Sequence, residues 1–403
     1  MFCGCQGPSP TTDQLPLSVG EWSLVMDAEN TLIPLRLFVT PEFELVFFNG
    51  DERINTGVPG IKNDSLYIEL PVYGTYLTGR ITSSRSFEGF WHYPQRSPDY
   101  VIPFTAEYID VSTSQESDIG EKSHRKFEVR FSPESDDEYP AVGLFEQRGN
   151  KVTGTFLTET GDYRFLEGLA EGDAFWMSCF DGAHLFYFDG SGWESGQLLG
   201  NFYSGKHWQE PWVAAPNPTA KLTHPDSLTY LIDPLQEFQL NLVRTDGEFV
   251  SFANADFREK VTIVQIFGSW CPNCLDESLY YNELYSKYQS QGLQVIPVAF
   301  ERSEDFETSS HRVKRYLTNL DITYPGYIGG QASKKVASQT FPMLNQIISF
   351  PTSIFIDKTG TVRKIHTGFY GPGTGEFYTR YTERTDLFVK QLLSETIDLT
   401  AAD

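Results

Sequence analysis

Two cysteines in the C-terminal half of this 403-residue chain have the spacing of a redox pair. Cys271 and Cys274 stand in the run Trp270-Cys271-Pro272-Asn273-Cys274, after the apolar stretch Val261 to Phe267 and before a segment with helical periodicity. Unpaired backbone N–H groups and the helix dipole favour a thiolate at a helix N-terminus, so Cys271 is the candidate nucleophile. Cys274, one turn further on the same face, is the candidate resolving thiol. Pro272 suits the first helical position, where its missing N–H costs nothing.

The same cysteine pair has three alternative interpretations: half of a zinc site, a structural disulfide, or a peroxidatic centre. Zinc takes about four ligands, and the sequence offers no second Cys-x-x-Cys or His-x₃-His to complete them. A peroxiredoxin expects Thr three residues before the cysteine, where this chain has Gly268. The pattern therefore favours a redox dithiol that needs no bound metal or cofactor, and peroxide consumption that depends on Cys271 would reveal a thiol peroxidase instead.

The elements that must position this pair alternate between strand and helix. After Val261 to Phe267 we expect a helix from Pro272 to about Ser290, a strand from Leu293 to Phe300 and a helix from about Glu304 to Leu320. A short helix around Ala332 to Thr340, strands Thr352 to Ile356 and Thr361 to Thr367, and a final helix from about Glu376 to Leu393 complete the series. This order predicts a parallel α/β sheet with helices on both faces.

The N-terminal half has a different pattern. Short alternating runs such as Leu32 to Val39 and Lys126 to Phe131 predict strands, and glycines inside three of the runs suggest a sandwich or a partly open barrel. Prolines between Ala214 and Pro234 mark a boundary. We therefore expect an N-terminal tether over residues 1–16, an all-β domain over 17–213, a linker over 214–235 and an α/β domain over 236–403.

A proline stands immediately before a strand in Phe350-Pro351-Thr352, about eighty residues after the cysteine pair. At this point the sequence resembles the thioredoxin superfamily, and within it the TlpA and ResA group of extracytoplasmic disulfide reductases. The resemblance covers about Phe238 to Leu393 and implies a cis-proline at Pro351 beside the dithiol, with Phe350, Pro351 and Thr352 facing an extended substrate segment. An ordinary trans-proline at a strand start is the alternative.

Two further residues gain roles from this resemblance. Cytosolic thioredoxin has a buried Asp where this chain has Gln265, and Glu277, at Cys-x-x-Glu spacing, is the group's substitute that accepts the proton of Cys274. A partly exposed helix carboxylate is the alternative for Glu277. Trp270 is expected to form an exposed flat surface against partners, or else to be a core aromatic.

The N-terminus contains two more cysteines, Cys3 and Cys5, before a Pro/Ser/Thr-rich stretch. A small residue before Cys5 and a tether after it resemble the end of a bacterial lipoprotein signal, with Cys5 as the lipid-bearing residue, although the charged and apolar regions of such a signal are missing. Either the true start codon lies upstream or both are incidental thiols. Acidic β-rich extensions of this kind resemble lipoproteins of Bacteroidetes-type bacteria.

Composition limits the partners. Lys and Arg number 31 against 54 Asp and Glu, and the net charge of −23 argues against nucleic acid and anionic lipid surfaces. No apolar run reaches the length of a membrane span, so a lipid anchor is the only membrane attachment we expect. Cys179 is expected to be an inert buried thiol, and Gly371 to Gly375 a loop without a nucleotide. The histidines have no metal-binding spacing in the sequence, and convergence of His184 with His207 in space is the minor alternative.

These observations together predict a thiol–disulfide oxidoreductase of the periplasm or cell envelope that reduces protein disulfides and receives electrons from a membrane dithiol donor, as the resemblance implies. A protein that binds a ligand or partner through the β-domain, with a secondary redox module, is the alternative of a different class.

Overall fold

The computed structural model describes residues 15–110 and 121–396, which divide into two compact units. The first unit runs to Tyr139 and resumes over Phe145–Gly154 and Phe165–Pro216. The second consists of Pro140–Leu144, Thr155–Arg164 and the chain from Asn217 onward. Two short segments that lie inside the predicted range 17–213 are therefore part of the C-terminal unit.

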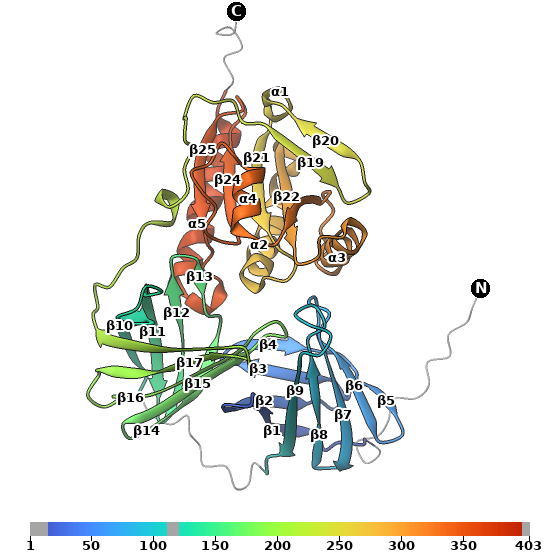
Figure 1. The fold of residues 1–403 in the computed structure, drawn as a ribbon, viewed down its shortest axis with the longest axis vertical. Helices are drawn as coiled ribbons and strands as arrows, with labels where there is room; N and C mark the ends of the chain where they lie inside the picture. Colours follow the sequence, from blue (N-terminus) through green and yellow to red (C-terminus); the bar gives the residue numbers. More distant parts are fainter. Residues whose placement is uncertain (1–14, 111–120, 397–403) are drawn as a thin grey trace, which may run out of the picture. The chain divides into compact units, whose positions relative to one another are not determined.

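Two antiparallel sheets account for the N-terminal half (Figure 1). The first has the order β4-β3-β2-β1-β9-β8-β7-β6-β5 and stays open. Its strands are β1 Gly20–Asp27, β2 Leu32–Val39, β3 Leu45–Asn49, β4 Glu52–Asn55, β5 Gly60–Lys62, β6 Ser65–Glu69, β7 Tyr76–Ser83, β8 Ser86–His92 and β9 Val101–Tyr108.

The second sheet has the order β11-β10-β18-β17-β16-β15-β14-β12-β13, and an additional pairing of β11 with β12 closes it. Its strands are β10 Ser123–Phe131, β11 Tyr139–Arg148, β12 Lys151–Thr158, β13 Gly161–Asp162, β14 Leu166–Glu171, β15 Ala174–Phe180, β16 Leu185–Ser191, β17 Leu198–Ser204 and β18 Trp208–Pro216. The predicted all-β class is confirmed, and the structure contains one open and one closed sheet.

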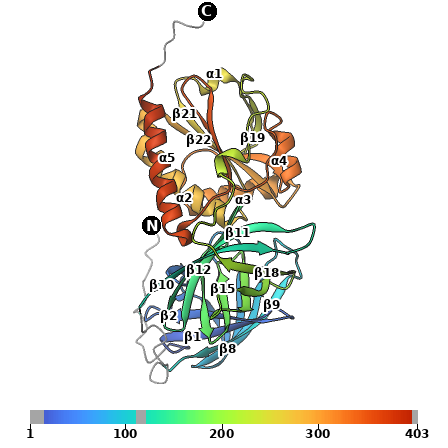
Figure 2. The ribbon, with the colours of Figure 1, turned by 90° about the vertical axis from the view of Figure 1, so that its left-hand side faces the viewer.

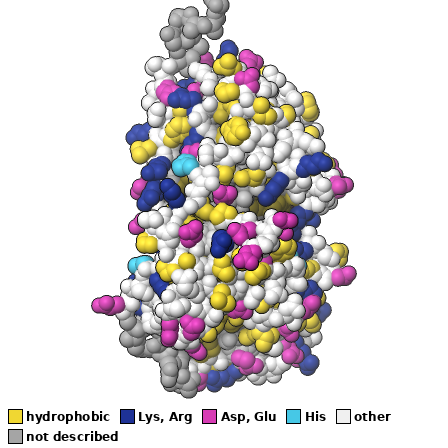
Figure 3. Space-filling model, turned by 60° about the vertical axis from the view of Figure 1, so that its left-hand side comes forward, with side chains coloured by type: hydrophobic (Ala, Val, Ile, Leu, Met, Phe, Trp, Pro, Cys, Tyr) yellow, Lys and Arg dark blue, Asp and Glu magenta, His cyan; other side chains and the backbone are white. Residues whose placement is uncertain are grey.

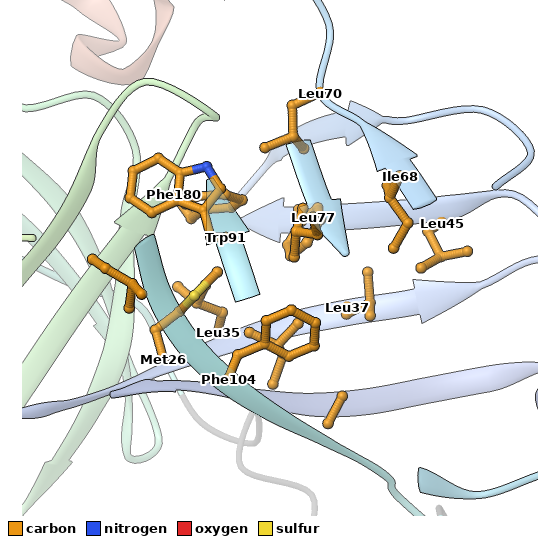
Figure 4. Packing of buried hydrophobic residues seen from close by; sticks show 14 of the residues in the cluster. Met26, Leu35, Leu37, Leu45, Ile68, Leu70, Leu77, Trp91, Phe104 and Phe180 are labelled. Carbon is orange, nitrogen blue, oxygen red and sulfur yellow. The ribbon is translucent and has the colours of Figure 1, made fainter. Parts of the chain in front are cut away.

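In the first sheet, buried residues alternate with less buried ones along the strands, and the buried side chains form the core. In β1, Trp22, Leu24 and Met26 are buried because every second side chain points to the same face. Figure 4 shows Met26 in this cluster with Leu35, Phe104 and other apolar side chains. Gly79 and Gly200 are two of the glycines inside the predicted strands, and the strand pairing continues through both of them without a bulge.

The C-terminal unit has one sheet of order β20-β19-β23-β22-β21-β24-β25. Strands β21, β22 and β23 are parallel, and the flanking pairs are antiparallel. The strands are β19 Leu240–Arg244, β20 Phe249–Phe252, β21 Val261–Phe267, β22 Leu293–Glu301, β23 Tyr327–Gln331, β24 Thr352–Ile356 and β25 Val362–Thr367. This order confirms the predicted thioredoxin-like fold. The prediction of a parallel sheet is wrong for the flanking strands, because β24 and β25 form an antiparallel hairpin and β24 runs antiparallel to β21. The hairpin of β19 and β20 is an unpredicted addition.

Helices cover both faces of this sheet, as Figure 2 shows with α5 on one side and α4 on the other. Tyr280 of α2 donates a hydrogen bond to the carbonyl of Thr382 in α5 at 2.7 Å, so these two helices share a face. The helices are η2 Pro225–Ser227, α1 Asn254–Phe257, α2 Pro272–Tyr288, η3 Gln289–Gln291, α3 Phe306–Asn319, α4 Lys334–Thr340, η4 Pro372–Thr374 and α5 Glu376–Ser394.

The proline-rich segment predicted as a linker packs into the C-terminal unit from Asn217 onward. Asp226 and His366 of β25 approach to 2.6 Å, and the backbone N–H of Tyr230 donates to the Asn345 side chain at 2.9 Å. Prolines end regular structure here, but side-chain hydrogen bonds still fix the chain.

Acidic and basic side chains are interspersed with neutral and apolar ones on the face shown in Figure 3. Within residues 15–110 and 121–396, no helix combines the length and the apolar character that crossing a membrane requires.

Candidate active site

Cys271 lies at the junction between β21 and α2, where it is the N-cap of the helix. Its sulfur accepts a hydrogen bond from the backbone N–H of Cys274 at 3.3 Å and lies 3.5 Å from the carbonyl oxygen of Phe350. All seven residues of β21 are buried, so the strand holds the start of α2 in a fixed position. An N–H donor directed at sulfur stabilises negative charge there, which is the property a nucleophilic cysteine needs.

The two cysteines differ in exposure. Cys271 keeps 7% of its surface exposed, whereas Cys274 is completely buried, and neither is in a disulfide. Burial raises the pKa of the Cys274 thiol well above its ordinary value, and the neighbouring Cys271 sulfur and Glu277 carboxylate raise it further. Cys274 therefore remains protonated near neutral pH until a base removes its proton.

Glu277 is completely buried one turn beyond Cys274, which excludes the alternative of a partly exposed surface carboxylate. Burial raises the pKa of Glu277 to about 7, although hydrogen bonds from three side chains act in the opposite direction. The donors are Gln265 at 3.0 Å, Ser353 at 3.0 Å and Tyr281 at 3.1 Å. A carboxyl group with a pKa near 7 can exchange a proton at neutral pH.

Gln265, which the sequence marked as a departure from thioredoxin, holds this carboxylate in place. Its amide nitrogen donates to Glu277, and its amide oxygen accepts from the hydroxyl of Ser278 at 3.1 Å. Tyr316 of α3 completes the network: its hydroxyl oxygen lies 3.0 Å from the Ser278 hydroxyl and 3.2 Å from the Cys274 carbonyl, and its single proton can be donated to either. The region behind the dithiol is thus a connected set of buried polar groups.

The predicted cis peptide is present between Phe350 and Pro351, directly before β24. Thr352 is buried, and its hydroxyl donates to the carbonyl of Ser349 at 2.9 Å. Because the Phe350 carbonyl lies beside the Cys271 sulfur, the proline loop and the dithiol form one site, as the sequence predicted.

Trp270 is half-buried and fits neither sequence-based alternative fully. Its indole N–H donates to the carbonyl of Phe300 at 2.9 Å, and its ring meets Phe350 edge-on at 5.8 Å. The Arg302 guanidinium lies 5.1 Å from the ring centroid. The indole is therefore fixed beside the dithiol with part of its surface exposed.

Sequence reasoning missed a second buried carboxylate, Glu301, at the end of β22. It accepts hydrogen bonds from the backbone N–H and the hydroxyl of Ser269, both at 2.9 Å, and burial raises its pKa. These bonds hold the loop that leads into Cys271. Sequence also missed Tyr281, although its i+4 spacing from Glu277 placed both side chains on one helix face.

The remaining candidates lie away from this site or outside the described residues. Cys5 and Cys3 lie outside the residues that the structure describes, and Cys179 is a buried thiol on β15. His184 contacts Asp181 at 3.1 Å, while His207 contacts Tyr100 at 2.9 Å. Between residues 15 and 110 and between 121 and 396, no group of three or more His, Cys, Asp or Glu side chains is arranged to hold a metal ion.

The segment that contains this site is similar in sequence to known proteins. The Redoxin family matches residues 232–376, about a third of the chain. The thiol-disulfide oxidoreductase ResA of Bacillus thuringiensis subsp. konkukian is 32% identical over 124 residues, covering 30% of this chain and 63% of that protein. ResA of Geobacillus thermodenitrificans is 32% identical over 128 residues, covering 32% of this chain and 66% of that protein.

Among solved structures, a thioredoxin-family thiol:disulfide interchange protein from Chlorobium tepidum TLS has a TM-score of 0.30 at 24% identity, covering 40% of this chain and 97% of that chain. The chain spans less than two thirds of the length of the ResA proteins it matches first. Residues 232–376 match the Redoxin family and are similar in sequence to ResA, in agreement with the resemblance that the cysteine and proline motifs indicated.

Proposed function

We propose that this protein is a thiol–disulfide oxidoreductase that reduces disulfide bonds in proteins. One observation carries the proposal: Cys271 caps the N-terminus of α2 beside a proline loop, while Cys274 is buried one turn deeper next to a carboxyl group. Unequal exposure of the two sulfurs supports unequal roles, an attacking thiolate and a resolving thiol.

The reaction begins when the thiolate of Cys271 attacks one sulfur of a substrate disulfide. A new S–S bond joins Cys271 to the substrate, and the second substrate sulfur leaves as a thiolate that takes up a proton. Glu277 then accepts the proton of Cys274, whose sulfur attacks Cys271 and releases the first substrate sulfur. Two electrons have passed to the substrate, and the protein is left with a Cys271–Cys274 disulfide.

A second cycle requires an external dithiol that reduces this disulfide. We assign this role to a membrane dithiol donor and place the protein in the periplasm or cell envelope, because an oxidising compartment regenerates no reductant itself. Similarity to a protein named thiol-disulfide oxidoreductase ResA supports the exchange chemistry, and the reducing direction is part of our proposal. Trp270 and Phe350 are proposed to shape the surface that meets the substrate. Thr352, which the resemblance also assigned to this surface, is completely buried and bonds to Ser349 instead.

Reduction of insulin disulfides by the purified chain, with dithiothreitol as electron source, tests the function. We expect turnover that depends on both cysteines, together with an equilibrium reduction potential of about −250 mV or lower, as in thioredoxin-like reductases. A potential near about −120 mV, typical of strong oxidants, would reverse the proposed direction of electron flow.

Lipid attachment through Cys5 is the proposed anchor at the cell envelope. The product of the complete native gene is then expected to enter the detergent phase in a Triton X-114 partition, and Cys5→Ser is expected to move it to the aqueous phase. Equal aqueous partition of both proteins would contradict the anchor.

A further inference from the structure

A ten-residue segment from the β-rich half of the sequence belongs to the same compact unit as the dithiol. This segment, Thr155–Arg164, is called the docked hairpin here. It contains the end of β12 and all of β13, which pair through Leu157 with Asp162 and through Thr158 with Gly161. The tip of the hairpin is therefore a tight turn at residues 159 and 160.

Asp162 fixes the docked hairpin to the first turn of α2. Its carboxylate accepts hydrogen bonds from the Asn273 side chain at 3.2 Å and from the backbone N–H of Gly371 at 2.6 Å. It also accepts one from the backbone N–H of Arg164 at 2.6 Å. Asn273 stands between the two cysteines in sequence, so the hairpin contacts the redox motif itself.

Arg164 makes a second, charged connection to α2. Its guanidinium pairs with Asp276 and lies 3.5 Å from the carbonyl of Pro272, with side-chain exposures of 5% for Arg164 and 11% for Asp276. Removing one partner of such a buried pair would leave an uncompensated charge in the interior. The ion pair therefore links the hairpin to the first turn of α2.

The tip of the hairpin also contacts the proline loop. The hydroxyl of Ser349 donates to the carbonyl of Thr160 at 2.6 Å, one residue before the cis peptide bond. Backbones approach closely: a Cβ on Gly368 would lie 2.9 Å from the carbonyl carbon of Thr160, and one on Gly161 would lie 2.9 Å from the Asn273 amide nitrogen. The backbone φ angle is also positive at both positions, +76° at Gly368 and +146° at Gly161, and glycine adopts such angles without strain.

The hairpin thus contacts both sequence segments that flank the nucleophilic sulfur, and Cys271 has only 7% of its surface exposed. We propose that the docked hairpin is a specificity-determining element that restricts access to Cys271, so that small disulfides and disulfides in extended segments react in preference to disulfides within folded proteins. This inference rests on the proposed function for its substrates, whereas restricted access to the sulfur can be tested independently.

Thiol labelling with two maleimides of different size tests access directly. N-ethylmaleimide and a maleimide carrying a long polyethylene glycol chain share one chemistry, so the ratio of their rate constants cancels any change in thiolate reactivity. The experiment uses the reduced full chain with Cys3→Ser and Cys5→Ser, and peptide mass spectrometry locates the label. We compare this protein with an Arg164→Ala/Asp276→Ala variant, which removes the buried pair without leaving a lone charge.

We expect the ratio of large-reagent to small-reagent rates to rise about tenfold in this variant, because the open hairpin becomes more populated. The matched control is Lys287→Ala/Asp386→Ala, which removes a partly exposed ion pair between α2 and α5. Its ratio is expected to equal that of the parent. An unchanged ratio in the Arg164 and Asp276 variant, or an equal rise in the control, overturns the proposal.

Folding and function have separate readouts. Labelling of the buried Cys179 would show that the Arg164→Ala/Asp276→Ala variant has unfolded. In that case Gly161→Ala is tested in its place, because its added methyl group pushes against Asn273. We expect the same rise in the ratio of labelling rates. With substrates, the ratio of kcat/KM for insulin to kcat/KM for hydroxyethyl disulfide is expected to rise in parallel with the labelling ratio. Absence of turnover with both substrates would contradict the proposed function and leave the labelling result intact.

Discussion

A Cys274→Ser variant is expected to accumulate a covalent mixed disulfide between Cys271 and its substrate. Cys271 can still attack, since the backbone N–H at position 274 that stabilises its sulfur remains after the substitution. The second sulfur that would release the substrate is gone, so the reaction stops halfway. Cys271→Ser removes the attacking atom instead, and we expect disulfide reduction to fall by about 10³-fold or more with no trapped adduct.

Non-reducing electrophoresis followed by mass spectrometry of the adduct measures this division of labour. Cys179→Ala is the matched control, because it removes a buried thiol that lies on β15 and takes no part in the proposed reaction. It should behave like the wild-type protein. Trapping by Cys271→Ser, with none by Cys274→Ser, would exchange the roles of the two sulfurs.

Local patterns predicted the C-terminal elements well. The uninterrupted apolar run of β21 indicated a strand buried on both faces, and the predicted helix after Pro272 begins where α2 begins. The cis peptide at Pro351 could be predicted from motif and context together. Such features depend on residues near one another in sequence, or on a spacing that the resemblance supplies.

Long-range contacts left no comparable signal. Asp162 lies 111 residues before Asn273, and neither side chain belongs to a pattern that indicates the other. Glu277 is surrounded by hydrogen-bond donors from three elements, β21, α2 and β24. Helical periodicity describes only α2, so it could not distinguish a buried Glu277 from a surface carboxylate. Likewise β1 pairs with β9 across some eighty residues, which is why the strands were predicted but the number of sheets was not.

The raised pKa of Glu277 has a consequence for stability that can be measured without any substrate. In the unfolded chain the carboxyl titrates near 4.5, and in the folded protein its pKa is about 7. Below pH 4.5 both states hold the proton. Between these values the unfolded state loses its proton first, so the contribution of Glu277 to folding declines as pH rises, by about 3 kcal/mol in total.

The free energy of unfolding of the wild type is therefore expected to fall between pH 5 and pH 8, and that of Glu277→Gln is expected to fall less. Denaturant titration at both pH values measures the difference. Glu283→Gln is the matched control, because it removes an exposed carboxylate from the same helix and should leave the pH dependence unchanged. Identical pH dependence in Glu277→Gln and the wild type would mean that Glu277 titrates at an ordinary pKa.

The same substitution has its larger effect on the resolution step. Gln keeps the size of the side chain and can still accept hydrogen bonds from Ser353 and Tyr281, but it cannot take the proton of Cys274. We expect resolution near pH 7 to slow by about 10–100-fold, the low end of general-base effects. In the wild type the rate should rise through pH 7, as Glu277 loses its own proton, and then level off.

Stopped-flow measurement separates this step from the attack by Cys271. Attack should change little in Glu277→Gln, because the helix N-terminus and the N–H of Cys274 stabilise the Cys271 thiolate without this carboxylate. Partial recovery of resolution is expected at high pH, where the Cys274 thiol ionises without a base, and Glu283→Gln should follow the wild-type profile. Equal resolution rates in Glu277→Gln and the wild type across this pH range would assign the proton transfer to another group and leave Glu277 a structural role in the buried polar network.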